Sequence, residues 1–189
     1  MRLFVAIALP EDIRDRLAAL QSGVPGARWV PPENFHLTLR FIGEADGRLA
    51  SDIDAALAGV SMPGFPITLA KVDRFGSGTK VRSLWAGVEP SEPLRRLQAK
   101  VEQALQRTGL APEGRKFKPH VTLARFNGTN PGARLYDYLS RQALFRAPSF
   151  EVREFVLYSS FLSQTGAIYR AEAEYPLART PLAIAASGD

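Results

Sequence analysis

The sequence predicts an α+β protein of two similar lobes related by a pseudo-two-fold axis, each an antiparallel sheet with helices. Two observations support this fold class. Predicted strands and helices follow the same order in both halves of the chain. Both histidines of the 189-residue chain also lie in one pattern, His-x-Thr-x, at positions 36 and 120, 84 residues apart. If the lobes pack on each other, the two HxT strands face each other across a central cleft. The alternative is a chance similarity between two common α+β patterns.

The first half gives a strand, a helix, a loop rich in glycine and proline, a strand, a helix and a strand. The residues are 2–8, 11–20, 25–34, 35–42, 47–59 and 66–74. The first helix is predicted because Ile13, Leu17 and Leu20 share one face. Two glycines, Gly43 and Gly47, mark a turn before the second helix.

The second half repeats that order and adds a last strand without a counterpart. The residues are 81–88, 91–109, 113–119, 120–126, 132–144, 150–159 and 167–175. Ser91 is a suitable N-cap for the long helix, and Gly109 is a suitable stop. Leu49 and Leu135, in corresponding helices, are 86 residues apart, so the offset between the halves is nearly constant.

These elements predict one bilobal domain over residues 1–175 and a flexible C-terminal tail over 176–189, where Pro181 and small residues predominate. The apolar N-terminal run is too short for a membrane span, because Pro10 and two acidic residues end it. We therefore expect a soluble, cytoplasmic protein with no membrane partner. We also expect a monomer, since the repeat already forms a closed two-lobe unit.

Composition excludes several kinds of chemistry. The chain has no cysteine, which removes disulfides, thiol nucleophiles and cysteine zinc sites. No GxSxG motif precedes a predicted helix, which argues against a serine hydrolase. Two distant histidines without a marked third ligand predict no metal site, and nothing indicates a cofactor. The net charge of +5 suits a polyanionic partner such as RNA, although many basic proteins bind none.

The HxT strands carry the candidate chemistry. Alternate side chains of a strand share a face, so His36 joins Thr38 on one polar face and His120 joins Thr122 on the other. The apolar residues of these strands, Phe41 included, are expected to face a core. A neutral imidazole accepts a proton and a charged one donates it, which suits phosphate-ester chemistry. A single HxT is more typical of a structural histidine, but two copies in a repeat favour catalysis.

Four segments carry a resemblance to a known family: RLFVAIALP, FHLTLRFIG, VRSLWAGV and KPHVTLAR. The doubled motif resembles the HxTx signatures of the 2H phosphoesterases. Within them, the chain is most similar to the RNA 2′,3′-cyclic phosphodiesterases, also called 2′-5′ RNA ligases, over residues 1 to about 175. The resemblance implies a bilobal fold and metal-independent hydrolysis of RNA 2′,3′-cyclic phosphate ends to 2′-phosphates. It also implies a reversible, ATP-independent 2′-5′ RNA ligation.

The resemblance further implies a role for each motif residue. His120 would be the general base that activates water, and His36 the general acid that protonates the departing 3′ oxygen. Thr38 and Thr122 would hold the phosphate, and Arg125 matches a position of phosphate contact. Strand alternation places Arg125 on the face opposite His120 unless the strand bulges there.

Further residues are candidates for contact with the substrate. Arg40, which shares a face with His36, and Lys118 are candidates for RNA contact, with a solvated surface charge as the alternative. Tyr169 resembles a late family element but receives no role. Other basic residues flank the expected cleft: Lys80, Arg82, Arg115 and Lys116.

The predicted partner is RNA with a 2′,3′-cyclic phosphate end, for which tRNA fragments are candidates. Two alternatives stay open. One is a phosphodiesterase acting on small nucleotides such as 2′-5′ oligoadenylates or cyclic dinucleotides. The other is a non-catalytic module that binds RNA ends. The presence of both histidines and both threonines argues against the second alternative.

Overall fold

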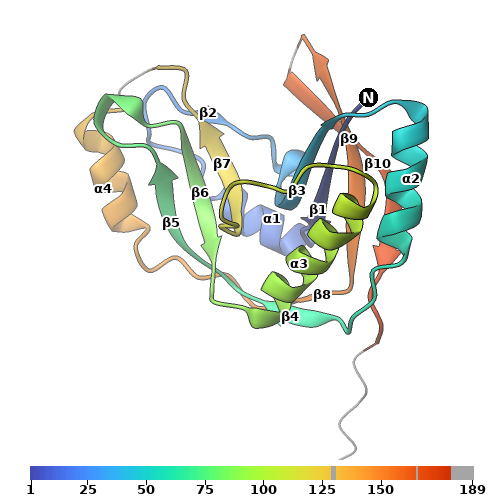
Figure 1. The fold of residues 1–189 in the computed structure, drawn as a ribbon. Helices are drawn as coiled ribbons and strands as arrows, with labels where there is room; N and C mark the ends of the chain where they lie inside the picture. The colour runs from blue at the N-terminus through green and yellow to red at the C-terminus, as the bar shows by residue number, and fades with distance from the viewer. Residues whose placement is uncertain (129–130, 165, 180–189) are drawn as a thin grey trace, which may run out of the picture.

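The computed structural model describes residues 1–128, 131–164 and 166–179, and within them the helices are distributed among the strands along the chain (Figure 1). The strands are β1 (Arg2–Ala8), β2 (Arg28–Trp29), β3 (His36–Glu44), β4 (Phe65–Ile67), β5 (Leu69–Phe75), β6 (Ser83–Val88), β7 (His120–Arg125), β8 (Phe150–Val152), β9 (Glu154–Ser163) and β10 (Gly166–Pro176). The α-helices are α1 (Glu11–Ala18), α2 (Gly47–Ala58), α3 (Glu92–Arg107) and α4 (Ala133–Arg141). Two short 3-10 helices span Pro32–Asn34 and Gly78–Lys80.

The main sheet has the strand order β10-β9-β1-β3-β7-β6-β5, with β2 paired to β7, and neighbouring strands are antiparallel. This confirms the predicted α+β class. The two expected sheets are joined into one, because β3 and β7 pair through Leu37 and Val121. The HxT strands are therefore neighbours in one sheet, and the groups of strands on either side of them stand apart in Figure 1.

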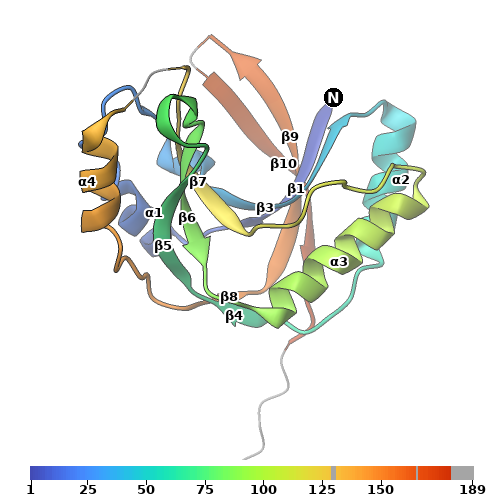
Figure 2. The same ribbon diagram turned by 60° about the vertical axis from the view of Figure 1, so that its left-hand side comes forward.

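The two lobes are not the two halves of the chain. Strand β5, from the first half, joins β6, whereas β9, from the second half, joins β1. The helices follow this exchange: α4 is hydrogen-bonded to the segment that ends α1, and α2 packs with α3 (Figures 1 and 2). Corresponding strands of the two halves of the chain are β1 and β6, β3 and β7, and β5 and β9. In the order β9-β1-β3-β7-β6-β5, the two members of each pair lie at equal distances from the centre of the sheet. A pseudo-two-fold axis requires such an order, and the axis itself stays a prediction.

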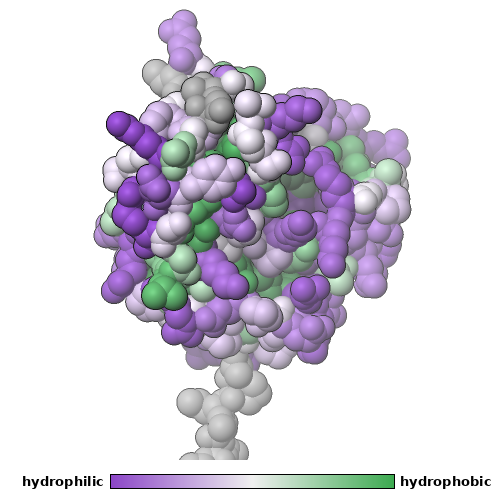
Figure 3. Space-filling view, turned by 90° about the vertical axis from the view of Figure 1, so that its left-hand side faces the viewer, coloured by the Kyte–Doolittle hydropathy of each residue, from purple (hydrophilic) through white to green (hydrophobic). Residues whose placement is uncertain are grey.

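Helices α2 and α3 begin where capping side chains satisfy free backbone N–H groups. The Ser91 hydroxyl accepts a hydrogen bond from the Leu94 N–H at 3.3 Å, as predicted for the start of α3. The Asp46 carboxylate does the same for the Leu49 N–H at 2.8 Å, which fixes the start of α2. Between α4 and the end of α1, the buried Tyr138 hydroxyl donates to the Leu20 carbonyl at 2.8 Å. In Figure 3, hydrophilic side chains predominate on the face over α4.

Two predicted strands are each split in the structure. The strand expected at 66–74 divides into β4 and β5, and the strand expected at 150–159 divides into β8 and β9. β4 and β8 pair with each other in a separate two-stranded sheet. Pro66 lies within β4 and cannot donate a ladder hydrogen bond, which suits a strand with a single partner.

The ordered chain continues beyond residue 175. Pro176 belongs to β10, and the Leu177 N–H donates to the Arg153 carbonyl at 2.8 Å. The Ala178 N–H donates to the Met62 carbonyl at 3.0 Å. The prediction of a flexible tail is therefore wrong for residues 176–178, because Leu177 is buried and its neighbours are hydrogen-bonded. Residues 180–189 of the predicted tail lie outside the described residues. In the described part of the chain, no helix is long and apolar enough to cross a membrane.

Candidate active site

The four HxT side chains are brought together by the pairing of β3 with β7. Because Leu37 lies opposite Val121 in an antiparallel pair, His36 comes opposite Thr122 and Thr38 comes opposite His120. Leu37 and Val121 are fully buried on the core side, which leaves the other face to the histidines and threonines. The two HxT strands, one from each group of strands, thus meet at the centre of the sheet.

A β-bulge places Arg125 on the same face as the histidines. On β6, Trp85 pairs with Thr122 and the next residue, Leu84, pairs with Ala124, so Leu123 is one extra residue in β7. Both Leu123 and Ala124 are buried, and Arg125 is exposed. The bulge reverses the alternation of side chains after Leu123. Regular alternation would have placed Arg125 on the face opposite His120, so the bulge is what brings it to the site.

The same irregularity in β3 corrects the prediction for Phe41. Val5 of β1 pairs with Arg40 and its neighbour Ala6 pairs with Thr38, so Leu39 is an extra residue in β3. Phe41 was expected in the core, but it is 59% exposed, with its ring 6.1 Å from that of Phe4. Strand alternation failed here because one inserted residue turns every later side chain to the other face.

Each imidazole is oriented by a backbone carbonyl two residues before it. Nδ1 of His36 lies 2.7 Å from the Asn34 carbonyl, and Nδ1 of His120 lies 2.6 Å from the Lys118 carbonyl. A carbonyl only accepts hydrogen bonds, so Nδ1 carries a proton in both rings. Nε2 of each histidine is therefore free to accept a proton when the ring is neutral and to donate one when it is charged.

Aromatic rings surround both histidines. The His36 ring centroid lies 4.9 Å from that of Phe4 and 5.2 Å from that of Tyr169. The His120 ring lies 4.9 Å from Phe75 and 6.0 Å from Trp85. Sequence reasoning gave none of these rings a place at the site, because strands β1, β5, β6 and β10 are brought near the HxT strands only by the sheet order. These rings remove water from one side of each imidazole.

Burial therefore lowers the pKa of both histidines. For His36 burial is the main cause, the hydrogen bond to Asn34 opposes it, and the charges of Arg125 and His120 add to it, giving a pKa of about 4. Burial also lowers the pKa of His120, opposed by the bond to Lys118 and helped by Arg125. Both rings are neutral at pH 7 in the free protein. The negative charge of a bound phosphate favours the charged form, so the substrate itself promotes protonation of one of them.

These shifts predict a pH-dependent stability. A histidine whose pKa falls on folding binds fewer protons in the native state, so its contribution is complete above the unfolded pKa of about 6.5 and is lost towards the folded pKa. We expect the free energy of unfolding in urea to fall between pH 6.5 and 4, by at most about 3 kcal/mol from His36. His36→Gln should flatten this slope, and carboxylates that titrate nearby affect both proteins alike. An equal slope in the two proteins would contradict the shift.

The Arg40 side chain is engaged in hydrogen bonds and ion pairs within the protein, so its guanidinium is not available to a substrate. Its Nε donates to Glu102 of α3 at 2.6 Å, and its two terminal nitrogens donate to the carbonyls of Phe41 and Ala111, both at 2.6 Å. Glu113 adds an ion pair at 3.5 Å. The side chain is 11% exposed. Because these partners occupy the guanidinium, we do not retain Arg40 as a candidate for RNA contact.

Arg40→Met is expected to lower the free energy of unfolding by about 2–4 kcal/mol, since it leaves the Glu102 carboxylate partly buried without its cation. Chemical denaturation measures the loss. Arg146→Met is the matched control, because the ion pair of Arg146 with Glu89 is exposed on both sides and should leave the transition unchanged. Equal effects of the two substitutions would show that Arg40 is a surface charge.

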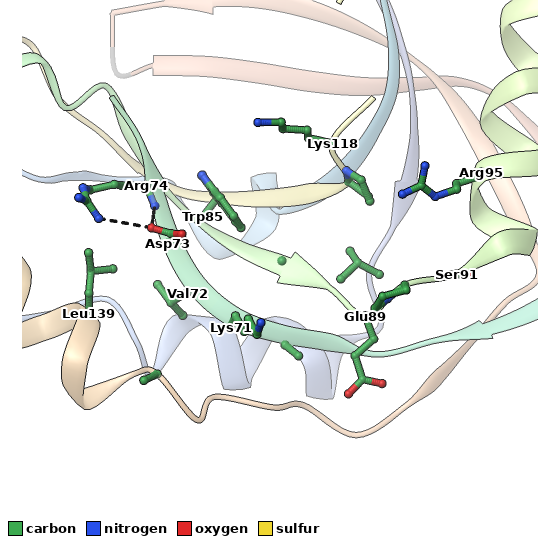
Figure 4. Close-up of a pocket in the computed structure, with 16 residues that line it drawn as sticks. Lys71, Val72, Asp73, Arg74, Trp85, Glu89, Ser91, Arg95, Lys118 and Leu139 are labelled. Atoms are coloured by element: carbon green, nitrogen blue, oxygen red, sulfur yellow. Dashed lines mark hydrogen bonds and ion pairs between the residues drawn. The ribbon is translucent and has the colours of Figure 1, made fainter. Parts of the chain in front are cut away.

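The other predicted basic residues remain on the surface. Lys80, Arg82, Lys116 and Lys118 are exposed, and Arg115 is exposed with an ion pair to Glu113 at 3.8 Å. Lys118 holds His120 through its carbonyl, and its side chain lines a cavity beside that histidine (Figure 4). Among the described residues, no group of three or more His, Cys, Asp or Glu side chains could hold a metal ion.

A family model for the 2′-5′ RNA ligase superfamily matches residues 9–160 of this sequence. The chain therefore belongs to this superfamily of 2H phosphoesterases, as its doubled HxT motif indicated. Both motifs, with His36 and His120, fall inside the matched segment.

Individual relatives agree with this membership. The RNA 2′,3′-cyclic phosphodiesterase of Aeropyrum pernix is 37% identical over 159 residues, which cover 84% of this chain and 89% of that protein. The protein of the same name from Archaeoglobus fulgidus is 33% identical over 173 residues, covering 90% and 97%. Among solved structures, Escherichia coli LigT complexed with 3′-AMP is similar with a TM-score of 0.76 and 27% identity, over 94% of this chain and 98% of LigT. The fold that the sequence predicted is thus the fold of these phosphoesterases.

Proposed function

We propose that this protein hydrolyses the 2′,3′-cyclic phosphate ends of RNA to 2′-phosphates by acid–base catalysis with two histidines. One observation carries the proposal: His36 and His120 lie on one face of adjacent strands, each with Nδ1 held by a backbone carbonyl. Relatives named RNA 2′,3′-cyclic phosphodiesterase support the choice of substrate. RNA with such an end, including a tRNA fragment, is the proposed partner, and the acting unit is proposed to be a monomer.

The chemistry follows from the free Nε2 atoms. Nε2 of His120 takes a proton from water, and the water oxygen forms a bond to phosphorus. The bond from phosphorus to the 3′ oxygen breaks, and Nε2 of His36 gives its proton to that oxygen. The bond to the 2′ oxygen stays, so the product is a 2′-phosphate. Thr38 and Thr122 donate hydrogen bonds to the other phosphate oxygens, and the charge of Arg125 stabilises them.

The roles of the two histidines rest on the family resemblance. In the free protein burial acts more strongly on His36, whose pKa falls to about 4, and the acid role requires His36 to be charged in the complex. A dianionic transition state beside Arg125 and the threonines supplies the negative charge that this protonation needs. An RNA 5′-hydroxyl in the place of the water would give a 2′-5′ linkage, which is the proposed ligation.

The test is a comparison of substrates with analysis of the product. An oligoribonucleotide with a 2′,3′-cyclic phosphate end should be converted to the 2′-phosphate alone, in the presence of a metal chelator. A 2′-5′ oligoadenylate and a cyclic dinucleotide, offered at equal concentration, should be poorer substrates. Formation of a 3′-phosphate would overturn the proposed bond cleavage, and a preference for the oligoadenylate would favour the small-nucleotide alternative.

A further inference from the structure

A cavity of about 550 Å³ opens beside His120. Its wall includes Lys118 and Pro119, the two residues directly before His120, and Trp85, whose ring lies 6.0 Å from the His120 ring. Strands β5 and β6 and the start of α3 supply other lining residues (Figure 4). The volume is that of a typical small-molecule site.

The charge that is free in this cavity is positive. Arg95 extends from α3 and Lys118 from the segment before β7, and Figure 4 shows both on the α3 side of Trp85. Neither makes an ion pair within the part of the chain that the structure describes. The acidic lining residues do: Asp73 and Glu89 each lie beside an arginine, at 3.5 and 2.7 Å. Lys71 also lines the cavity without an ion pair among the described residues, so three cations remain for a ligand with negative charge.

Trp85 gives the cavity an aromatic wall. Its Nε1 is buried and does not face the cavity, so the ring contributes through its surface. Gly87 leaves room for the ring, because a Cβ at this position would lie 3.2 Å from the ring and 2.9 Å from the Ala70 carbonyl. Aromatic rings beside cations are the means by which proteins hold single-stranded RNA, through stacking and phosphate contact.

We propose that this cavity binds the nucleotide that precedes the cyclic-phosphate end of the RNA, with Arg95 contacting its phosphate and Trp85 packing against its base. This rests on the proposed function and deepens it, because it makes the end of an RNA chain a better substrate than a free nucleotide. A nucleoside 2′,3′-cyclic phosphate ends in a 5′-hydroxyl and brings no phosphate to Arg95. The protein therefore discriminates by chain length, and the discrimination depends on Arg95.

The experiment compares kcat/KM for adenosine 2′,3′-cyclic phosphate and for a short oligoadenylate with the same end, in wild type, Arg95→Gln and Arg96→Gln. Arg96 is the matched control: it is the next residue of α3, equally charged and exposed, and it does not line the cavity. Arg95→Gln should reduce the advantage of the oligonucleotide by about threefold to tenfold and leave the mononucleotide rate unchanged. It should also reduce the slope of log kcat/KM against log salt by about 0.7, the value for one phosphate of a single strand.

Several outcomes overturn the inference. They are a wild type that does not prefer the oligonucleotide, an equal loss on both substrates, and an equal effect of Arg96→Gln. Hydrolysis of the mononucleotide reports the proposed function separately. If wild type hydrolyses neither substrate, the proposed function is wrong and the cavity assignment falls with it.

Discussion

His36→Ala and His120→Ala are each expected to lower kcat/KM for a 2′,3′-cyclic phosphate by about 10²–10⁴-fold or more, the usual contribution of a general acid or base. Each substitution removes the Nε2 atom that its backbone carbonyl leaves free for proton transfer. Both rings are half-buried against aromatic side chains, so the variants need a check of folding by circular dichroism. A folded variant that keeps full activity would contradict the catalytic assignment of that histidine.

The same pair of variants separates the acid from the base. A p-nitrophenyl phosphodiester has a leaving group that departs without a proton, so loss of the general acid should cost much less on it than loss of the general base. We expect His36→Ala to recover most of its lost activity on this ester and His120→Ala to recover little. The reverse result would exchange the two roles and make His36 the base. The lowered pKa of His36 in the free protein favours that exchange, because a neutral imidazole accepts a proton.

Thr38→Val and Thr122→Val are each expected to lower kcat by about 10²–10³-fold, as loss of one donor to a developing negative charge does in other enzymes. Valine keeps the shape and the β-branch of threonine, so the loss isolates the hydroxyl group. The pairing of Leu37 with Val121 places each threonine next to the histidine of the other strand. Single-turnover rates on the cyclic-phosphate oligonucleotide measure the effect.

Serine provides the matched control for these two variants. Thr38→Ser and Thr122→Ser keep the hydroxyl and should retain most of the activity. If serine loses activity while valine retains it, the methyl group and not the hydroxyl is what the site requires. Unchanged activity in both valine variants would remove the threonines from phosphate binding.

Local pattern was enough to place the two HxT motifs in corresponding strands, which the structure shows as the neighbours β3 and β7. The faces on which Arg125 and Phe41 lie could not be predicted in this way. Both lie five residues after a histidine, and both reach the catalytic face because an extra residue, Leu123 or Leu39, bulges its strand. A bulge depends on the partner strand, so alternation within one strand cannot reveal it.

Contacts between distant segments were also beyond the sequence. Arg40 was a candidate for RNA contact because strand alternation predicts it on the polar face with His36, but its guanidinium is held by Glu102 from α3. The aromatic surroundings of His120 come from β5 and β6 through the sheet order. Leu177 is held by Arg153, and local composition gives no sign of that contact. Each of these depends on tertiary packing that a one-dimensional pattern does not contain.

The central claim is that His36 and His120 act on one phosphate, and the chain offers a direct measurement because it has two histidines. Nuclear magnetic resonance of the imidazole protons gives the pKa of each ring, assigned with the single variants, in the free protein and with bound adenosine 2′-phosphate. We predict that both pKa values lie below 6.5 in the free protein and that both rise when the nucleotide binds. A rise at one histidine alone, or at neither, would contradict a shared phosphate site.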